Sequence, residues 1–126
     1  MKKKILIIED DPLILEATFE FLKEESFDVS TAVNGLEGIE RAIEIIPDLI
    51  ISDISMPYKN GHDVYKTLQS IPKTSKIPFI FFTANVQKDN LQIGTDDYLL
   101  KPFRYSDLLE SIRIGLEKND CYLKQR

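Results

Sequence analysis

Short, continuous apolar runs constrain the fold of this chain more than any other feature. Residues 5–8, 49–51 and 79–82 carry no polar side chain, and two of these runs are dominated by isoleucine and leucine. A strand with one face in water alternates polar and apolar residues, whereas a strand covered on both faces does not. The runs therefore predict strands of a parallel sheet with helices on both faces, and residues 29–33 and 98–100 are weaker strand candidates.

Amphipathic segments separate these runs and predict helices. Apolar residues recur at helical spacing in at least three of them: Ile14, Ala17 and Phe21; Leu36, Ile39, Ile43 and Ile46; and Leu108, Ile112 and Leu116. Asp11 followed by Pro12 is typical of a helix cap with proline in the first helical position. Five β–α units in succession predict a three-layer α/β fold with right-handed crossovers.

Length and charge narrow the class of protein. The 126 residues suit one domain, which we place at 1–118, and the polar residues 119–126 form a tail or the start of a linker. A net charge of −5 argues against direct nucleic-acid binding by this chain. Three lysines at 2–4 precede an apolar run too short for a signal peptide or a membrane span. With a single cysteine, we expect a cytoplasmic protein.

Functional side chains follow four of the five predicted strands. Glu9 and Asp10 follow the first run, Asp53 ends the third, Thr83 follows the fourth and Lys101 follows the fifth. Ligands of such folds bind at the carboxyl ends of the strands. Clustered carboxylates repel one another, and a hard divalent cation such as Mg²⁺ relieves that repulsion. An aspartate can also act as a nucleophile toward phosphorus.

Each of these signals has a plainer interpretation when it stands alone. An acid after a strand is often a helix cap, which can be the whole role of Asp11, and a lone aspartate is often a turn residue. A threonine after apolar residues is usually an ordinary strand residue. Such residues at four strand ends are harder to explain in this way, and together they favour phosphoryl transfer assisted by a metal ion.

The motifs that carry these residues resemble the receiver domains of response regulators over almost the whole chain. They are ILIIEDD at 5–11, DISMP at 53–57 with Gly61, FTA at 82–84 and DDYLLKPF at 96–103. The resemblance implies a flavodoxin-like fold with a parallel five-stranded sheet of order 2-1-3-4-5. It also implies a signalling switch of a two-component system, and not a conventional enzyme.

The resemblance assigns a role to each matching residue. Asp53 is the expected phosphoacceptor and also a metal ligand. Glu9 and Asp10 form the acidic pair that binds Mg²⁺, with Asp10 as a direct ligand and Glu9 acting through water. The backbone carbonyl of Ser55 is a further expected metal ligand. Thr83 and Lys101 are expected to bond the phosphoryl oxygens.

The resemblance also implies a readout and partners. Tyr98 is expected to move inward when Thr83 reorients, and the Lys101–Pro102 bond is expected to be cis. The donor would be a sensor histidine kinase or a phosphotransfer protein. An unidentified output partner or effector domain would read the face made by the fourth helix, fifth strand and fifth helix. Whether the chain forms a homodimer is left open.

One segment departs from the usual pattern of the family, and the single histidine needs an interpretation of its own. Residues 84–95 are about one helical turn shorter than is common in the family, so we expect a shortened and mobile fourth helix there. His62, the only histidine, follows Gly61, and we expect it on a surface loop. The short segment is the best argument for the alternative, a pseudo-receiver that binds partners without phosphorylation.

Two enzyme or cofactor classes on related folds fit less well. Some hydrolases and mutases with an aspartate nucleophile need a second aspartate two residues later, where this chain has Ser55. A flavin-binding protein would need a phosphate-binding loop after the first strand, where this chain has three acidic residues.

Overall fold

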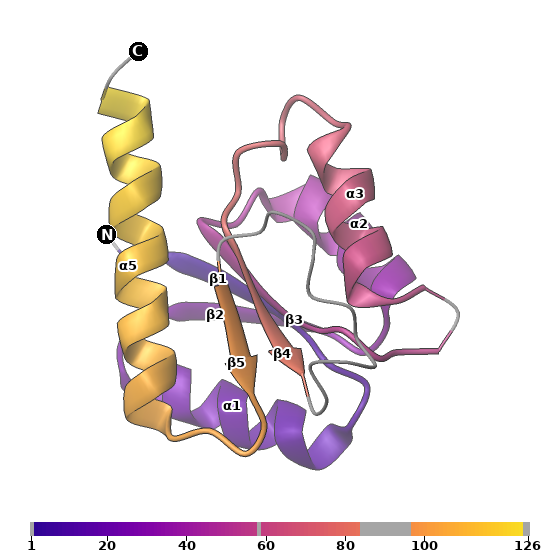
Figure 1. The fold of residues 1–126 in the computed structure, drawn as a ribbon, viewed down its shortest axis with the longest axis vertical. Coiled ribbons are helices and arrows are strands. Elements are labelled where there is room, and N and C mark those ends of the chain that lie inside the picture. The colour runs from indigo at the N-terminus through magenta and orange to yellow at the C-terminus, as the bar shows by residue number, and fades with distance from the viewer. Residues whose placement is uncertain (1, 58, 84–96, 125–126) are drawn as a thin grey trace.

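A computed structural model describes residues 2–57, 59–83 and 97–124 of the chain (Figure 1). Strands and helices alternate along it from β1 to β4, as the apolar runs predict. In chain order the elements are β1 (Lys4–Ile8), α1 (Pro12–Glu24), β2 (Asp28–Ala32), α2 (Gly35–Ile45), β3 (Leu49–Asp53), α3 (Gly61–Gln69), β4 (Phe79–Thr83), β5 (Asp97–Leu100) and α5 (Tyr105–Lys124).

The strands form one parallel sheet in the order β2-β1-β3-β4-β5, which confirms the expected topology. Register brings the carboxyl ends of the strands to one edge, because Ile8 pairs with Ser52 and Thr83 pairs with Leu100. Asp53, the last residue of β3, pairs with Phe82. The segments that follow β1, β3 and β5 therefore begin at this edge, where β4 ends with Thr83.

Helices cover both faces of the sheet and give a three-layer structure (Figure 1). Leu6 and Ile8 point to the side of α2 and α3, where they meet a cluster that includes Val64. Ile5 and Ile7 point to the opposite side, toward α1 and α5. Burial on both faces explains why the strands lack polar residues. Phe79, Phe81 and Phe82 are core residues, as expected.

Polar side chains fix where the helices begin. The Asp11 carboxylate accepts hydrogen bonds from the backbone N–H groups of Leu13 (2.9 Å) and Ile14 (3.4 Å), so it caps α1 as predicted. Asn60 caps α3 by accepting from the Asp63 N–H (2.9 Å), and the Asp63 carboxylate accepts from the Asn60 N–H (3.3 Å). This reciprocal pair fixes the first turn of α3 next to the end of β3.

Two further predictions concern residues 84–95 and the C-terminal end of the chain. The expected short fourth helix in residues 84–95 lies outside the described residues. The last helix, α5, continues to Lys124, so residues 119–124 are helical and lie beyond the domain end predicted at 118. In the described part of the chain, no helix is long and apolar enough to cross a membrane.

Candidate functional site

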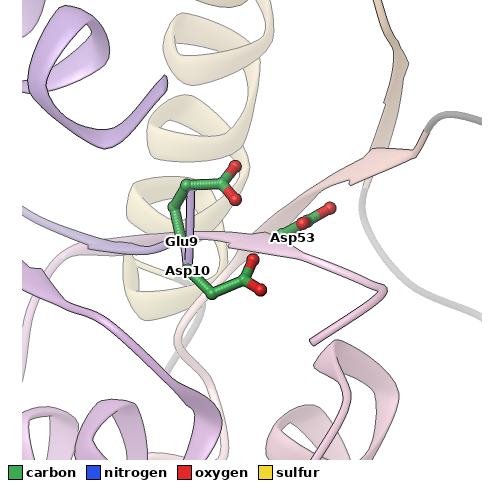
Figure 2. A group of neighbouring side chains, drawn as sticks. All are labelled: Glu9, Asp10 and Asp53. Atoms are coloured by element: carbon green, nitrogen blue, oxygen red, sulfur yellow. The ribbon is translucent and has the colours of Figure 1, made fainter. Parts of the chain in front are cut away.

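Three carboxylates meet at the carboxyl edge of the sheet (Figure 2). Glu9 and Asp10 follow β1, and Asp53 ends the neighbouring strand β3. One oxygen from each of the three lies within 4.8 Å of the others. Parallel pairing of adjacent strands thus brings together acids that are more than 40 positions apart in sequence, as the strand-end argument predicts.

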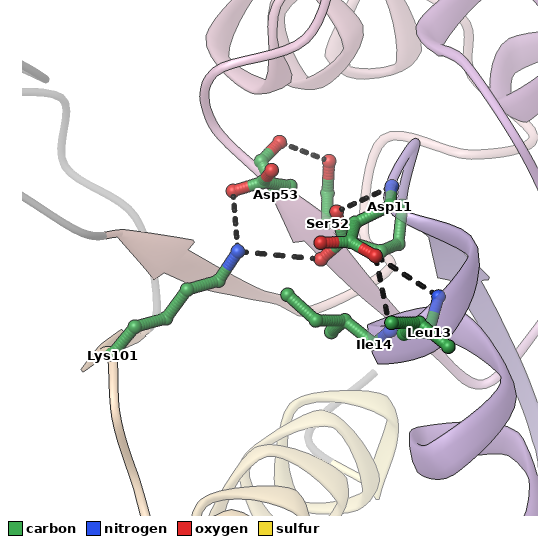
Figure 3. A network of polar contacts seen from close by, with 7 residues as sticks. Asp11, Leu13, Ile14, Ser52, Asp53 and Lys101 are labelled. Atoms are coloured by element: carbon green, nitrogen blue, oxygen red, sulfur yellow. Dashed lines mark hydrogen bonds and ion pairs between the residues drawn. The ribbon is translucent and has the colours of Figure 1, made fainter.

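Lys101 supplies the positive charge of this cluster (Figure 3). Its Nζ lies 3.3 Å from Oδ1 of Asp53 and 3.4 Å from Oε1 of Glu9. The backbone places the side chain, because the Lys101 N–H donates to the carbonyl of Thr83 at 2.8 Å. The Lys101–Pro102 peptide bond that follows is cis, as the resemblance implies.

Burial gives the acids unequal environments. Glu9 is 1% exposed and Asp53 8% exposed, whereas Asp10 is exposed to solvent. Burial, reinforced by the charge of Asp53, raises the pKa of Glu9 from 4.5 to about 7, although Lys101 opposes the rise. Burial likewise raises the pKa of Asp53, against the lowering effect of Lys101. One ammonium group is therefore too little charge for this set of carboxylates.

A divalent cation fits this excess of negative charge. All three acids offer oxygen ligands, which suit Mg²⁺ better than zinc or copper. The exposed Asp10 lies on the solvent side, where a hydrated ion could enter and keep part of its water shell. The residues present thus fit the magnesium site expected from the sequence, with Glu9, Asp10 and Asp53 as its side-chain ligands.

The loop after β3 folds back closely against Asp53. The N–H of Gly61 donates to the carbonyl of Ile54 at 2.9 Å, and the N–H of Ile54 donates to the carbonyl of Phe82 at 3.1 Å. A Cβ atom on Gly61 would lie 2.4 Å from the Asp53 carbonyl oxygen. Only glycine therefore allows this approach, which explains the Gly61 of the sequence motif.

Thr83, Ser55 and Tyr98 come from β4, the segment after β3, and β5, respectively. Thr83 ends β4 and is 1% exposed, one position beyond the partner of Asp53 in the sheet. Ser55 lies two residues after Asp53, and its side chain is exposed. Tyr98 lies on β5 and stacks on Phe81, with ring centroids 5.4 Å apart. The predicted roles of these three residues stay predictions.

His62 does not lie on a surface loop, so that expectation is wrong. It stands in the first turn of α3, half-buried, with its ring edge-on to Phe81 at 5.4 Å and to Tyr98 at 6.4 Å. The spacing of Asn60 and Asp63 is a capping-box pattern, and it would have placed residue 62 inside a helix.

Comparison with known proteins agrees with this architecture. The family model described as "Response regulator receiver domain" matches residues 5–113. The DNA-binding dual master transcriptional regulator RpaA of Synechocystis is 37% identical over 121 residues, which cover 93% of this chain and 50% of that protein. The probable transcriptional regulator ycf29 of Porphyra purpurea is 38% identical over 117 residues, which cover 90% of this chain and 56% of that protein. The chain thus spans about half the length of these curated relatives.

Solved structures show the same fold. A CheY-like receiver domain protein from Methanospirillum hungatei has a TM-score of 0.87 at 27% identity, covering 97% of this chain and 99% of its own. The receiver domain of sensor histidine kinase PA1611 from Pseudomonas aeruginosa has a TM-score of 0.86, and the match covers 93% of this chain and 99% of that domain. That structure is described with a magnesium ion in the active site cleft, but at 24% identity the likeness concerns the fold alone.

Proposed function

The chain belongs to the response regulator receiver domain family, and from this premise we propose that it is a phosphorylation switch of a two-component system with Asp53 as the acceptor. The observation that carries the proposal is the position of the Asp53 carboxylate, which is almost buried and shares the ammonium group of Lys101 with Glu9. A buried carboxylate in contact with a lysine and two further acids suits nucleophilic attack on phosphorus assisted by a metal ion.

The proposed transfer uses this chain's own groups as follows. An Asp53 oxygen attacks the phosphorus of a donor phosphohistidine, and the bond from phosphorus to the imidazole nitrogen breaks with its electron pair left on nitrogen. Lys101, already 3.3 Å from Asp53, then pairs with a phosphoryl oxygen. Mg²⁺ bound by Glu9, Asp10 and Asp53, with the Ser55 carbonyl, would neutralise charge on the phosphoryl oxygens.

Reset and readout complete the switch. Water attacks phosphorus in line with the Asp53–phosphorus bond, releases phosphate and returns the carboxylate, so the chain acts on its own modification and not on a separate substrate. While the phosphoryl group is present, a hydrogen bond from the Thr83 hydroxyl would favour the conformation in which Tyr98 turns inward. A partner that binds this conformation would shift the population further.

An apolar hollow that Lys101 helps to line suits a protein donor. Its volume is about 460 Å³, and it lies between the first half of α1 and the chain that follows Lys101, lined by Leu13, Ile14, Phe103 and Tyr105 among others. Leu13 is 77% exposed at its rim. A small phosphodonor needs no such surface, whereas a helix that carries a phosphohistidine would bury it on docking. This supports a histidine kinase or phosphotransfer protein as the donor.

The acceptor is tested by mass spectrometry. Intact protein is incubated with Mg²⁺ and acetyl phosphate, and we expect a mass increase of one phosphoryl group that is lost in Asp53→Asn and in EDTA. No increase in the wild-type protein, or an equal increase in Asp53→Asn, would contradict the proposal and leave the pseudo-receiver as the better interpretation.

Donor docking is tested separately with a charged residue at the rim of the hollow. Leu13→Lys is expected to slow transfer from a phosphohistidine protein by about tenfold or more while transfer from acetyl phosphate stays unchanged. The matched control is Leu36→Lys, which is 59% exposed on α2 and does not line the hollow. Equal slowing by both variants would argue against this docking surface.

A further inference from the structure

Three aromatic rings from three elements meet on the α3 side of the sheet. His62 in the first turn of α3 is edge-on to Phe81 of β4 at 5.4 Å and to Tyr98 of β5 at 6.4 Å. Phe81 and Tyr98 stack on each other at 5.4 Å with an interplanar angle of 26°. The imidazole thus contacts both members of the stack, whereas Tyr65, which also comes from α3, contacts Phe81 at 6.0 Å.

The helix turn that carries His62 is attached directly to the acceptor segment. Its neighbour Gly61 is bonded to the carbonyl of Ile54 and lies so close to the Asp53 carbonyl that a Cβ atom would meet it at 2.4 Å. The reciprocal cap between Asn60 and Asp63 fixes the backbone of this turn. Because the contact with Asp53 is this close, we expect a movement of the backbone at Asp53 to move the start of α3 as well.

The other side of the ring cluster connects with the expected switch residues. Phe81 pairs with Tyr98 in the sheet, and Thr83 pairs with Leu100 two positions farther along the same two strands. Because side chains alternate along a strand, Thr83 stands on the same face as Phe81. The ring of Tyr98 therefore lies on the same face of the sheet as Phe81 and Thr83, and on this face it contacts the ring of His62.

We propose that His62 is a positioning residue of the switch, which couples the acceptor Asp53 to the placement of Tyr98 through the first turn of α3. The inference rests on the proposed phosphorylation of Asp53. In this arrangement Tyr98 receives two inputs, the hydroxyl of Thr83 and the imidazole edge of His62. Its ring can turn only if its contact with His62 breaks or moves with it.

Space filling alone is the simpler interpretation of a half-buried ring, and it predicts a different response to substitution. Leucine at position 62 would fill much of the same volume, so a filling role predicts a normal switch in His62→Leu. The proposed role depends on ring contacts, which leucine lacks and phenylalanine keeps. Loss of one aromatic pair changes an equilibrium by about two- to tenfold, and the balance between the two positions of Tyr98 should change by that factor.

The test combines NMR with the mass assay. Because the chain has one histidine, the imidazole signals of the labelled protein belong to His62 without further assignment. The ring signal of Tyr98 is identified by its loss in Tyr98→Phe. Mg²⁺ with beryllium fluoride, a phosphoryl mimic for carboxylates, is added at fixed pH to the wild type and to His62→Leu, His62→Phe and, as a matched control on an exposed part of α3, Lys66→Leu.

We expect the mimic to shift both the His62 and the Tyr98 signals of the wild type. In His62→Leu the Tyr98 shift should fall by about half or more, while phosphoryl uptake from acetyl phosphate stays within about twofold. His62→Phe should recover most of the Tyr98 response, and Lys66→Leu should match the wild type. A normal Tyr98 response in His62→Leu, or no recovery in His62→Phe, overturns the inference.

Two further outcomes separate this inference from the proposed function. Wild-type protein that takes up no phosphoryl group overturns both. Wild-type protein that takes up the group while its His62 signal stays fixed overturns the coupling alone. This second readout needs no variant, so it decides the question even if His62→Leu proves unfolded by circular dichroism.

Discussion

Replacing Glu9 with glutamine should stabilise the metal-free protein, although it removes a residue of the site. Glu9 is 1% exposed, and its charge is unfavourable there because of burial and the nearby carboxylate of Asp53. Glutamine has nearly the same shape and keeps an oxygen that can accept from the Asp11 N–H, as Oε2 of Glu9 does at 3.2 Å. It carries no charge, so the repulsion disappears while the packing remains.

The magnitude follows from the pKa of Glu9, which is about 7 in the folded protein against an ordinary value of 4.5. Since one pKa unit corresponds to about 1.4 kcal/mol, the ionised form destabilises the fold by about 3 kcal/mol at pH 8. Because the pKa of Glu9 is higher in the folded protein, the stability that protonated Glu9 gives to the fold is fully present below pH 4.5. It is lost as the pH rises through about 7. At pH 5 the same relation leaves less than about 1 kcal/mol.

Urea unfolding in EDTA measures the effect at both pH values. We expect the free energy of unfolding of Glu9→Gln to be about 1 to 3 kcal/mol higher than that of the wild type at pH 8. The lower end allows for the lost ion pair with Lys101. The gain should fall by about 2 kcal/mol at pH 5. Asp10→Asn is the matched control, and because Asp10 is exposed its effect should stay below about 0.5 kcal/mol.

Addition of Mg²⁺ should reverse the order of the two proteins. A ligand that binds only the folded state stabilises it by mass action, and the wild type keeps all three carboxylates for the ion. The reasoning is refuted if Glu9→Gln shows no gain over the wild type at pH 8 in EDTA. It is equally refuted if the gain is the same at pH 5, because burial of a charge could not then be its cause.

Two other substitutions test the geometry around Asp53. Gly61→Ala should destabilise the fold by about 2 kcal/mol in urea unfolding, since its Cβ would meet a backbone oxygen at 2.4 Å. The control is Gly115→Ala, whose Cβ would meet the end of a side chain at 2.9 Å and which should destabilise the fold less. Lys101→Met should slow phosphoryl uptake from acetyl phosphate, followed by intact mass, by about tenfold or more. The control Lys66→Met changes an exposed lysine and should leave the rate unchanged. Equal rates in the two variants would exclude a role for Lys101 in the transfer.

Much of the fold and the composition of the site could be predicted because both depend on patterns that are local in sequence. Runs such as residues 79–82 are apolar throughout, which is typical of strands buried on two faces, and parallel pairing then brings the residues after the strands to one edge. Glu9, Asp53 and Lys101 could therefore be placed together before any distance was known. That Lys101 reaches both acids, at 3.3 and 3.4 Å, depends on the exact path of the backbone and could not be predicted.

His62 shows why another part of the site was missed. A histidine after glycine suggested a loop, because glycine is a common turn residue. The cap formed by Asn60 and Asp63 instead starts α3 at Gly61, and the sheet then places Phe81 and Tyr98 beside the imidazole. The helix start was present in the sequence as a capping-box spacing, but the ring contacts arise from residues 19 and 36 positions away. Only the tertiary structure brings those rings together.

The same excess of negative charge that destabilises the metal-free site would make it responsive to the proposed phosphorylation. Lys101 is shared between Glu9 and Asp53, and neither acid is fully compensated, because burial still raises the pKa of both. Conversion of the Asp53 carboxylate to an aspartyl phosphate would move the negative charge outward, onto oxygens that Lys101 and Thr83 could reach. The lysine cannot keep both original contacts and also follow the phosphoryl group. Its redistribution at the end of β5, three residues from Tyr98, is therefore a direct physical route from modification to readout.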